Sequence, residues 1–265
     1  MPAPQRSLAS AFLLAVGLTT SAAAQGLDIA TTKIVDLTHK IDADTIFWPT
    51  EAKTFELVEE HKGLTERGFF YAANRFCSPE HGGTHIDAPY HFAQGGETVA
   101  AIPIERLKGP AVVIDVADKA ARDPDYTLQP ADVTAWEAQH GPIAEGAIVL
   151  LRTGWSSRWP NKRAYLGDDT PGDASHLHFP SYGPEAARLL VERGAVVLGV
   201  DTASVDHGPS KDFLVHRVLG AANVVGIENL TNLEAVPVTG AWVLALPMKI
   251  ANGTGAPARV VALVP

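Results

Sequence analysis

Short runs of apolar residues recur along the chain and predict buried β-strands. The runs are four to six residues long and rich in Val, Ile, Leu and Ala, and turn residues flank most of them. This pattern is typical of strands that are covered on both faces. The predicted strands are Ile34 to Leu37, Ala111 to Val116, Ala147 to Leu151, Val196 to Val200, Val224 to Ile227, Trp242 to Leu246 and Val260 to Val264.

Two segments carry helix signals instead. The segment Pro130 to His140 begins with a proline at a first-turn position and ends before a glycine. The segment Pro184 to Arg193 begins and ends in the same way. More strand than helix, without a regular βαβ repeat, predicts a compact α/β domain with a substantial sheet.

The segments between these elements contain no linker with a shifted composition, so we expect one domain. The stretch from Trp155 to Pro180 lacks a clear period and is predicted to be a long ordered loop. The stretch from Ala251 to Pro257 is rich in turn residues and is predicted to connect the last two strands.

Composition narrows the class of protein. Hydrophobic residues make up 46% of the 265 residues and charged residues 19%, which excludes a disordered or fibrous chain. A net charge of −9 without basic clusters disfavours binding to nucleic acid or to an anionic membrane. The single cysteine, Cys77, excludes an intrachain disulfide and a cysteine-based zinc site.

The N-terminal 24 residues have the pattern of a signal peptide. Arg6 forms a short positive region, an apolar run follows from Leu8 to Thr20, and small residues then lead to Gln25. The apolar run is too short for a membrane span. We therefore expect cleavage after Ala24 and an exported domain over residues 25–265, periplasmic if the source is Gram-negative and otherwise secreted.

The candidate metal-binding and proton-transferring residues concentrate in one segment, from His81 to His91, with the sequence HGGTHIDAPYH. His81, His85, Asp87 and His91 are separated by even intervals, and even spacing in an extended chain places side chains on one face. The glycines and the proline disfavour a helix here. Imidazoles and a carboxylate at one point form a ligand set for a divalent ion such as Zn or Mn.

His91 leaves two roles open from the residues alone. It follows Asp87 by four positions and lies beyond a proline. It could be a further metal ligand, or an unligated base beside the metal, because an imidazole titrates near neutral pH.

The segment resembles the H-x-G-T-H-x-D-x-P-x-H signature of the metal-dependent cyclase-like hydrolases, a family that includes bacterial kynurenine formamidase and isatin hydrolase. Other stretches agree from about Ile34 onward. They are Val35 to His39 (VDLTH), Phe47 to Pro49 (FWP), Gly199 to Asp206 (GVDTASVD), and His216 followed twelve residues later by Glu228 in GIENL.

The resemblance implies a role for each matching residue. His81, His85 and Asp87 would hold the first metal, and His216 and Glu228 would complete a second that Asp87 bridges. His91 would be the catalytic acid/base. Trp48 would contact the substrate.

The resemblance also implies the fold and the activity. The fold would be a single domain of the swivelling β/β/α type, and the protein would form a homodimer or homotetramer. The activity would be hydrolysis of a C–N amide or formamide bond in a small aromatic substrate by metal-activated water, with one or two Zn or Mn ions per subunit.

Three functional interpretations stay open. An arylformamidase would act in tryptophan catabolism. An isatin hydrolase or another opener of cyclic amides or lactones would suit an exported protein. A periplasmic metal- or ligand-binding protein without turnover is the alternative from another class, and an unligated His91 would argue against it.

Overall fold

The computed structural model describes residues 30–265. The predicted signal peptide, residues 1–24, lies outside the described residues. Within residues 30–265 no helix is long and apolar enough to cross a membrane.

Eight strands form the central sheet, in the order β1-β12-β11-β5-β7-β9-β10-β4. A further pairing of β12 with β4 closes the sheet into a barrel-like ring, with β1 attached outside it. The strands are β1 (Lys33–Asp36), β4 (His85–Asp87), β5 (Lys108–Asp115), β7 (Ile148–Arg152), β9 (Val197–Val200), β10 (Val225–Glu228), β11 (Trp242–Pro247) and β12 (Gly255–Val264).

Strands β5, β7, β9 and β10 run parallel. Their continuous apolar sequences follow from this position, because parallel strands are covered on both faces. Alternate residues of these strands face opposite ways: Val113 and Leu150 pack inside the ring, whereas Val112 and Leu151 belong to a second cluster outside it.

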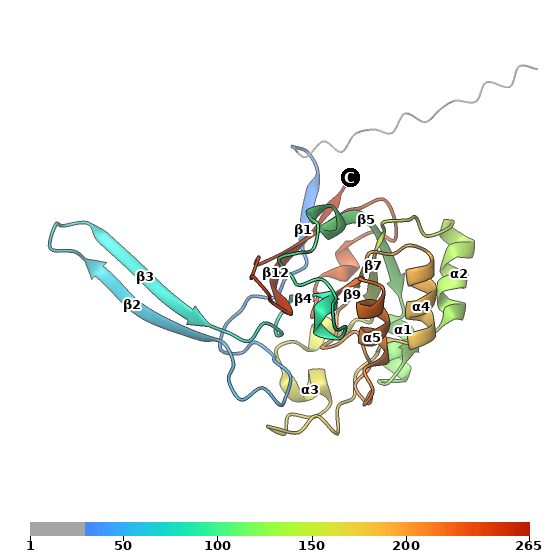
Figure 1. The fold of residues 1–265 in the computed structure, drawn as a ribbon, viewed down its shortest axis with the longest axis horizontal. Helices are drawn as coiled ribbons and strands as arrows, with labels where there is room; N and C mark the ends of the chain where they lie inside the picture. The colour runs from blue at the N-terminus through green and yellow to red at the C-terminus, as the bar shows by residue number, and fades with distance from the viewer. Residues whose placement is uncertain (1–29) are drawn as a thin grey trace, which may run out of the picture.

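Helices cover the outer face of the parallel strands (Figure 1). Buried residues of α2, α4 and α5 complete the outer apolar cluster. The helices are α1 (Ala117–Arg122), α2 (Pro130–His140), α3 (Lys162–Leu166), α4 (Pro184–Glu192) and α5 (Leu214–Ala221), and the 3-10 turns are η1 (Pro89–His91), η2 (Ile104–Leu107), η3 (Trp155–Arg158) and η4 (Leu233–Ala235).

Most predicted elements are present, with shifted ends. The predicted strands correspond to β1, β5, β7, β9, β10, β11 and β12, and the predicted helices to α2 and α4. The predicted connection Ala251 to Pro257 is wrong in its second half, because β12 begins at Gly255 and pairs there with Asp87 of β4. This early start of β12 closes the ring.

The predicted loop from Trp155 to Pro180 contains η3 and α3 and has its own apolar core. Trp155, Tyr165 and Phe179 are buried there together with Ile46. The segment is therefore a packed layer beneath the site rather than an open excursion.

Two small sheets complete the fold. Strands β6 (Thr127–Leu128) and β8 (Ser181–Tyr182) pair in parallel. Strands β2 (Glu56–Leu64) and β3 (Phe70–Cys77) form an antiparallel hairpin that projects far from the body (Figure 1). The sequence patterns above do not predict this hairpin.

Candidate metal centre

Strand β4 positions the first ligands. It lies between β10 and β12, and its register places His85 opposite Glu228 and Asp87 opposite Gly226. Ile86 and Ile227 point into the core, so the side chains of His85, Asp87 and Glu228 share the opposite face. All three are buried.

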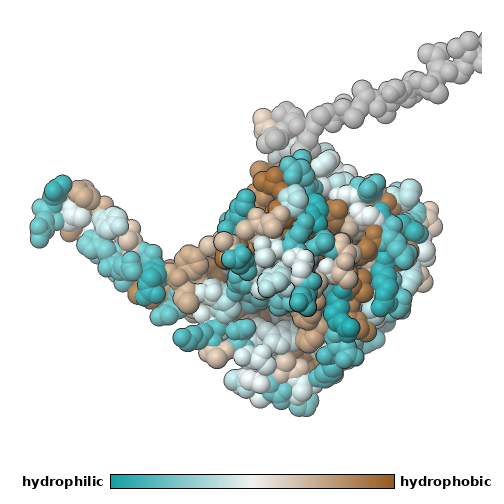
Figure 2. Space-filling model, in the orientation of Figure 1, coloured by the Kyte–Doolittle hydropathy of each residue, from teal (hydrophilic) through white to brown (hydrophobic). Residues whose placement is uncertain are grey.

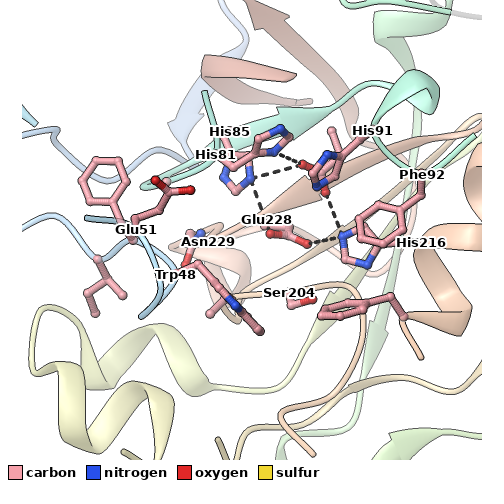
Figure 3. A pocket seen from close by; sticks show the side chains of 16 residues that line it. Trp48, Glu51, His81, His85, His91, Phe92, Ser204, His216, Glu228 and Asn229 are labelled. Atoms are coloured by element: carbon pink, nitrogen blue, oxygen red, sulfur yellow. Dashed lines mark hydrogen bonds and ion pairs between the residues drawn. The ribbon is translucent and has the colours of Figure 1, made fainter. Parts of the chain in front are cut away.

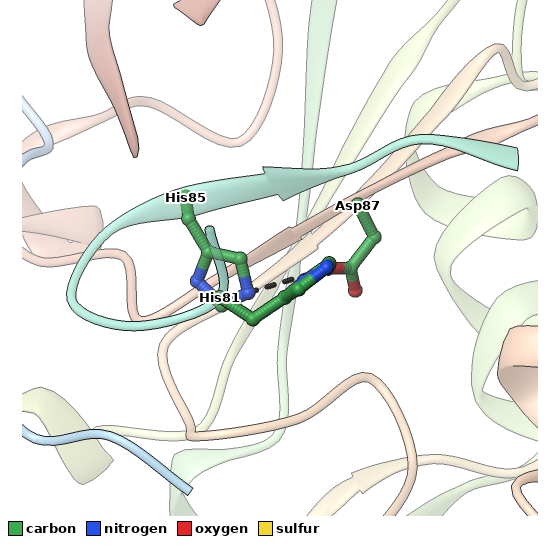
Figure 4. Close-up of side chains that lie close together, drawn as sticks. All are labelled: His81, His85 and Asp87. Atoms are coloured by element: carbon green, nitrogen blue, oxygen red, sulfur yellow. Dashed lines mark hydrogen bonds and ion pairs between the residues drawn. The ribbon is translucent and has the colours of Figure 1, made fainter. Parts of the chain in front are cut away.

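A tight turn brings His81 back to the same point. Gly83 has a φ of 58°, and a Cβ atom at Gly82 would overlap the ring of Phe47. This turn places His81 Nδ1 at 2.7 Å from Asp87 Oδ1 (Figure 4). His81 therefore joins the site through the glycine turn, and the expectation of one continuous extended stretch is correct only for His85 and Asp87.

The distal residues predicted from the resemblance meet the proximal ones. His216 lies in the first turn of α5, and its Nε2 is 3.3 Å from Asp87 Oδ2 and 3.2 Å from Glu228 Oε1. Figure 3 shows His81, His85, His216 and Glu228 converging. Two sets of potential ligands result, His81–His85–Asp87 and Asp87–His216–Glu228, and they share Asp87.

In each imidazole of these sets, the ring nitrogen that points away from the carboxylates has a hydrogen-bond partner. His85 Nδ1 lies 2.9 Å from the carbonyl oxygen of Gly83, to which it donates. His216 Nδ1 lies 2.7 Å from Asp206 Oδ2. In the neutral tautomer that these contacts select, Nε2 of both rings presents a lone pair to carboxylate oxygens.

Two consecutive hydrogen bonds, through Thr254 to Glu80, fix the tautomer of His81 in the same way. Thr254 Oγ1 donates to the Glu80 carboxylate at 2.6 Å, so it can only accept from His81 Nε2, at 2.8 Å. The neutral ring then turns the lone pair of Nδ1 toward Asp87. Thr254 and Glu80 carry no sequence signal, because each is a single polar residue without a pattern around it.

The lone pairs of the imidazole nitrogens and of the carboxylate oxygens repel each other unless a cation lies between them. His85 Nε2 and Asp87 Oδ2 are buried and have no hydrogen-bond partner among the described residues. The contacts of 3.2–3.4 Å between nitrogen and oxygen match the roughly 3.3 Å that separates ligand atoms around a tetrahedral ion with bonds of about 2.0–2.1 Å. The residues present therefore fit divalent metal.

Charge in the metal-free centre follows from the same contacts. Without a metal, protons on the imidazoles can take its place: burial would raise the pKa of Asp87, but hydrogen bonds from the protonated His216, His81 and His85 hold it well below its ordinary value. Burial and the neighbouring Asp87 charge raise the pKa of Glu228. Burial would lower the pKa of His85, but Asp87 and Glu228 raise it to about 9.

His91 stands apart from both ligand sets. It lies in η1, beyond the end of β4, and its ring stacks on His81 with the ring centres 3.9 Å apart. It is in neither group that could hold a metal. Burial lowers the pKa of His91 to about 4, so the imidazole is neutral at pH 7. Of its two open roles, the geometry favours an unligated base.

An aromatic pocket of about 230 Å³ opens onto the centre. Trp48, the predicted substrate contact, lines it and packs against Phe179 and Phe213. Phe92, labelled in Figure 3, and Phe213 complete the aromatic wall, and the sequence patterns did not single out either of them. Glu51 lies at the same pocket, and no Lys or Arg of the described chain lines it.

Asp201 and Asp206, in the stretch that resembles the family, support neighbouring residues through hydrogen bonds. Asp201 directly follows β9 and accepts hydrogen bonds from Thr153 and Gly154. Asp206 also orients a potential metal ligand, because its carboxylate accepts hydrogen bonds from the backbone N–H and the ring Nδ1 of His216. His176 and His178 are exposed and lie outside the pocket lining.

Comparison with known proteins places the chain in a family. Residues 35–207 match the Cyclase family model. Isatin hydrolase of Roseibium aggregatum is 35% identical over 246 residues, which cover 88% of this chain and 92% of the relative. Kynurenine formamidase of Salinibacter ruber is 26% identical and covers 86% and 96%.

Solved structures resemble the whole fold. An isatin hydrolase bound to the product analogue thioisatinate superposes with a TM-score of 0.81 at 32% identity, covering 89% of this chain and 94% of that one. Isatin hydrolase A from Labrenzia aggregata, bound to benzyl benzoate, gives 0.80 at 38% identity and covers 90% and 96%. The predicted α/β single-domain fold is thereby confirmed, and the chain belongs to the Cyclase family of cyclase-like hydrolases.

Proposed function

We propose that this protein is a metal-dependent hydrolase that cleaves the C–N bond of an amide in a small aromatic substrate. The observation that carries the proposal is the set of three imidazoles and two carboxylates whose lone pairs converge beside an unligated His91. The relatives isatin hydrolase and kynurenine formamidase are amide hydrolases by name.

The ligand set suits Zn or Mn, with one or two ions per subunit. His81, His85 and Asp87 would hold one ion, and Asp87, His216 and Glu228 a second. A bound divalent ion would lower the pKa of a water molecule to about 7 and polarise a carbonyl oxygen.

The chain's own contribution is proton transfer and positioning. Hydrolysis adds the OH of water to the carbonyl carbon, breaks the C–N bond and delivers a proton to the departing nitrogen. His91 is neutral at pH 7 and can take the proton from water and pass it to that nitrogen. Trp48, Phe92 and Phe213 would pack on an aromatic ring and exclude water from it.

The pocket favours an uncharged cyclic amide such as isatin. Its titratable side chains are carboxylates and histidines, and no Lys or Arg of the described residues lines it to pair with a substrate carboxylate. A neutral bicyclic ring requires no such partner, so it would enter without an unpaired charge.

A formamide substrate such as N-formylkynurenine is the second candidate. Glu51 lines the pocket and could pair with the ammonium group of such a substrate. This activity would place the protein in tryptophan catabolism, whereas the predicted export favours an environmental aromatic amide or lactone.

A protein that only binds a metal or ligand would not need His91. An unligated imidazole stacked on a ligand at 3.9 Å adds nothing to metal storage, yet it serves proton transfer.

We further propose export after cleavage behind Ala24, and self-association as a homodimer or homotetramer.

The test is turnover by the metal-loaded protein. Isatin and N-formylkynurenine would be followed side by side by ultraviolet absorbance, with Zn and with Mn. We expect isatin to be hydrolysed with the higher kcat/KM. Stoichiometric metal binding with no turnover of either substrate, or of aromatic lactones and amides, would leave a binding protein as the interpretation.

A further inference from the structure

Asn229 carries a buried amide that none of the roles above explains. Hydrophilic side chains are spread over the surface of the body (Figure 2), but Asn229 is only 3% exposed. It follows Glu228, the last residue of β10, and belongs to neither ligand set. It lines the pocket beside Glu228 (Figure 3). A buried amide is costly unless its polar atoms are paired, so its partners indicate what it does.

The backbone of Asn229 adopts a conformation that few residues accept. Its φ is 55°, in the left-handed region. Glycine adopts this region without strain, and asparagine is one of the few residues with a side chain that visits it routinely. A glycine would suit the backbone equally well, and the amide group is what a glycine would lack.

The amide of Asn229 bonds to the turn that carries the proximal ligands. Its Nδ2 donates to the carbonyl oxygen of Gly83 at 2.8 Å. The same oxygen accepts a hydrogen bond from Nδ1 of His85 at 2.9 Å. A carbonyl oxygen has two lone pairs, so both bonds can form together. The amide therefore holds the oxygen that sets the orientation of the His85 ring.

The orientation of this ring decides where its free nitrogen points. Nε2 of His85 lies 3.3 Å from Oδ1 of Asp87 and 3.4 Å from Oε2 of Glu228. A rotation of the ring would move Nε2 away from both oxygens. Because Asn229 directly follows Glu228, its amide ties the position of one ligand to the orientation of another.

A second hydrogen bond joins the same two segments. Oγ1 of Thr84 donates to the backbone carbonyl oxygen of Asn229 at 2.6 Å and accepts a hydrogen bond from the backbone N–H of His39 at 2.9 Å. The bond from Thr84 uses the main chain of Asn229, so it does not depend on the side chain. The amide can therefore be removed without separating the two segments.

Tyr165 fixes which way the amide faces. The oxygen of Gly83 can only accept, so Asn229 must present Nδ2 to it and Oδ1 to the other side. There the hydroxyl of Tyr165 lies 3.0 Å from Oδ1. The same hydroxyl lies 3.2 Å from the carbonyl oxygen of Asp201, and it has one hydrogen to donate. Tyr165 is fully buried in the packed layer beneath the site, so this layer orients the amide.

We propose that Asn229 is a positioning residue of the metal centre. Its amide, oriented by Tyr165, fixes the carbonyl oxygen of Gly83 and thereby aims Nε2 of His85 at the carboxylates. The inference rests on the metal binding of the proposed function, since the aim of His85 matters only in a centre that binds metal. It requires no contact between Asn229 and the substrate.

The test removes the amide and leaves the backbone conformation allowed. Asn229→Gly keeps the left-handed conformation without strain. The carbonyl oxygen of Gly83 keeps its bond from His85, and the hydroxyl of Tyr165 can turn to the carbonyl oxygen of Asp201. The substitution therefore leaves each former partner of the amide with another partner.

Asn232→Gly is the matched control. Asn232 also has a left-handed backbone, with a φ of 56°, and its amide also donates to a backbone carbonyl oxygen, that of Asp36, at 2.8 Å. It is exposed and lies outside the pocket lining. The control thus removes the same groups three residues away from Asn229 without reaching the ligands.

The first readout is metal affinity, measured for Zn and Mn by competition with a metal-sensitive dye, well below the melting temperature. We expect Asn229→Gly to bind about 10-fold to 100-fold more weakly, the usual effect of losing an outer partner of a ligand, and Asn232→Gly to bind like the wild type. The second readout is the visible absorption of the Co(II)-loaded protein, which reports ligand geometry. It should change in Asn229→Gly alone, whereas a purely structural role would leave it unchanged.

Tyr165→Phe tests the chain of contacts independently. Loss of the hydroxyl leaves Oδ1 of Asn229 without this partner, and we expect metal binding to weaken by about 10-fold, the lower end of the same range. In the Asn229→Gly background the same substitution should have no further effect, because the amide through which it acts is gone. Such non-additivity is expected within one hydrogen-bond network and not for two independent sites.

These readouts need no substrate, so they test Asn229 separately from the proposed hydrolysis. Wild-type affinity and an unchanged Co(II) spectrum in Asn229→Gly would overturn the positioning role alone. A wild type that binds none of the three metals would overturn the metal-dependent function together with this inference. If Asn229→Gly does not fold, Tyr165→Phe decides: weaker metal binding with native circular dichroism supports the role, and wild-type affinity overturns it.

Discussion

The three ligand imidazoles and His91 differ in what occupies their ring nitrogens. His81, His85 and His216 each have one nitrogen fixed by an outer oxygen and the other aimed at the carboxylates. No hydrogen bond from residues 30–265 fixes the ring of His91, which is held instead by stacking on His81. Three rings are therefore prepared to bind a cation, and the fourth is free to exchange a proton.

This difference predicts that His91→Ala keeps the metal and loses activity. Loss of general acid–base catalysis should reduce kcat about 10²–10⁴-fold, while the metal content measured by atomic emission stays at the wild-type level. His176→Ala, at an exposed histidine outside the pocket lining, serves as the control. Loss of metal in His91→Ala with unchanged turnover per bound ion would refute the role.

The relay behind His81 predicts an effect without any contact to substrate. Thr254→Val keeps the shape of the side chain but removes the hydroxyl that joins His81 Nε2 to Glu80. We expect about 10-fold to 100-fold weaker metal binding, the usual effect of losing an outer partner of a ligand. A competition titration with a metal-sensitive dye measures it, and wild-type affinity in Thr254→Val would argue against the relay.

At the level of single residues, spacing predicted the ligands but not their supports. The even intervals of His81, His85, Asp87 and His91 identified the centre, although a glycine turn and a 3-10 turn, rather than one strand, bring the outer two residues to it. His216 and Glu228 came from the family resemblance, because their partners are more than a hundred residues away. Thr254 and Asp206 act through tertiary contacts that leave no local pattern.

At the level of elements, the N-terminus of α5 joins structure and chemistry. Asp206 accepts hydrogen bonds from the backbone N–H groups of Val215 and His216. Its Oδ2 also accepts a hydrogen bond from Nδ1 of His216. One carboxylate thereby caps the helix and orients a metal ligand.

Asp206→Asn separates these two roles. Asparagine still caps helices well, so the melting temperature of the metal-free protein should change little. The lost charge weakens the hold on His216, and metal affinity should fall about 10-fold or more. Asp206→Ala should lower both affinity and melting temperature. Equal loss of stability in the two variants would assign Asp206 to capping alone.

The elements that could be predicted are those whose pattern is dictated by burial. The parallel strands are apolar throughout because both faces are covered, and α2 and α4 have clear first and last residues. The hairpin of β2 and β3 escaped prediction because its residues are largely exposed and mix charges with aromatics. Helix α5 escaped because its short apolar sequence, LVHRVLGA, resembles a strand as much as a helix.

At the scale of the whole molecule, the site lies where the sheet closes. Strand β4 joins β10 to β12 and completes the ring, and the ligands of β4 and β10 stand on the outer side of this junction. Local patterns cannot predict such closure, because it depends on pairings between residues that are distant in sequence. The closure also buries the ligands, so metal binding must be coupled to the stability and protonation of the whole domain.

This coupling predicts how metal removal depends on pH. In the metal-free protein the pKa of His85 is raised to about 9 from an ordinary 6.5, so its contribution to stability is complete below pH 6.5 and is lost as the pH rises to about 9. Metal binding must displace this proton and therefore strengthens over the same interval. The metal-free protein should become less stable from pH 6.5 to 9, while the gap in melting temperature between metal-loaded and chelator-treated protein should widen by several degrees. Thermal melts of both forms at each pH measure the gap, and a gap that narrows toward pH 9 would show that the histidines are already neutral in the metal-free centre.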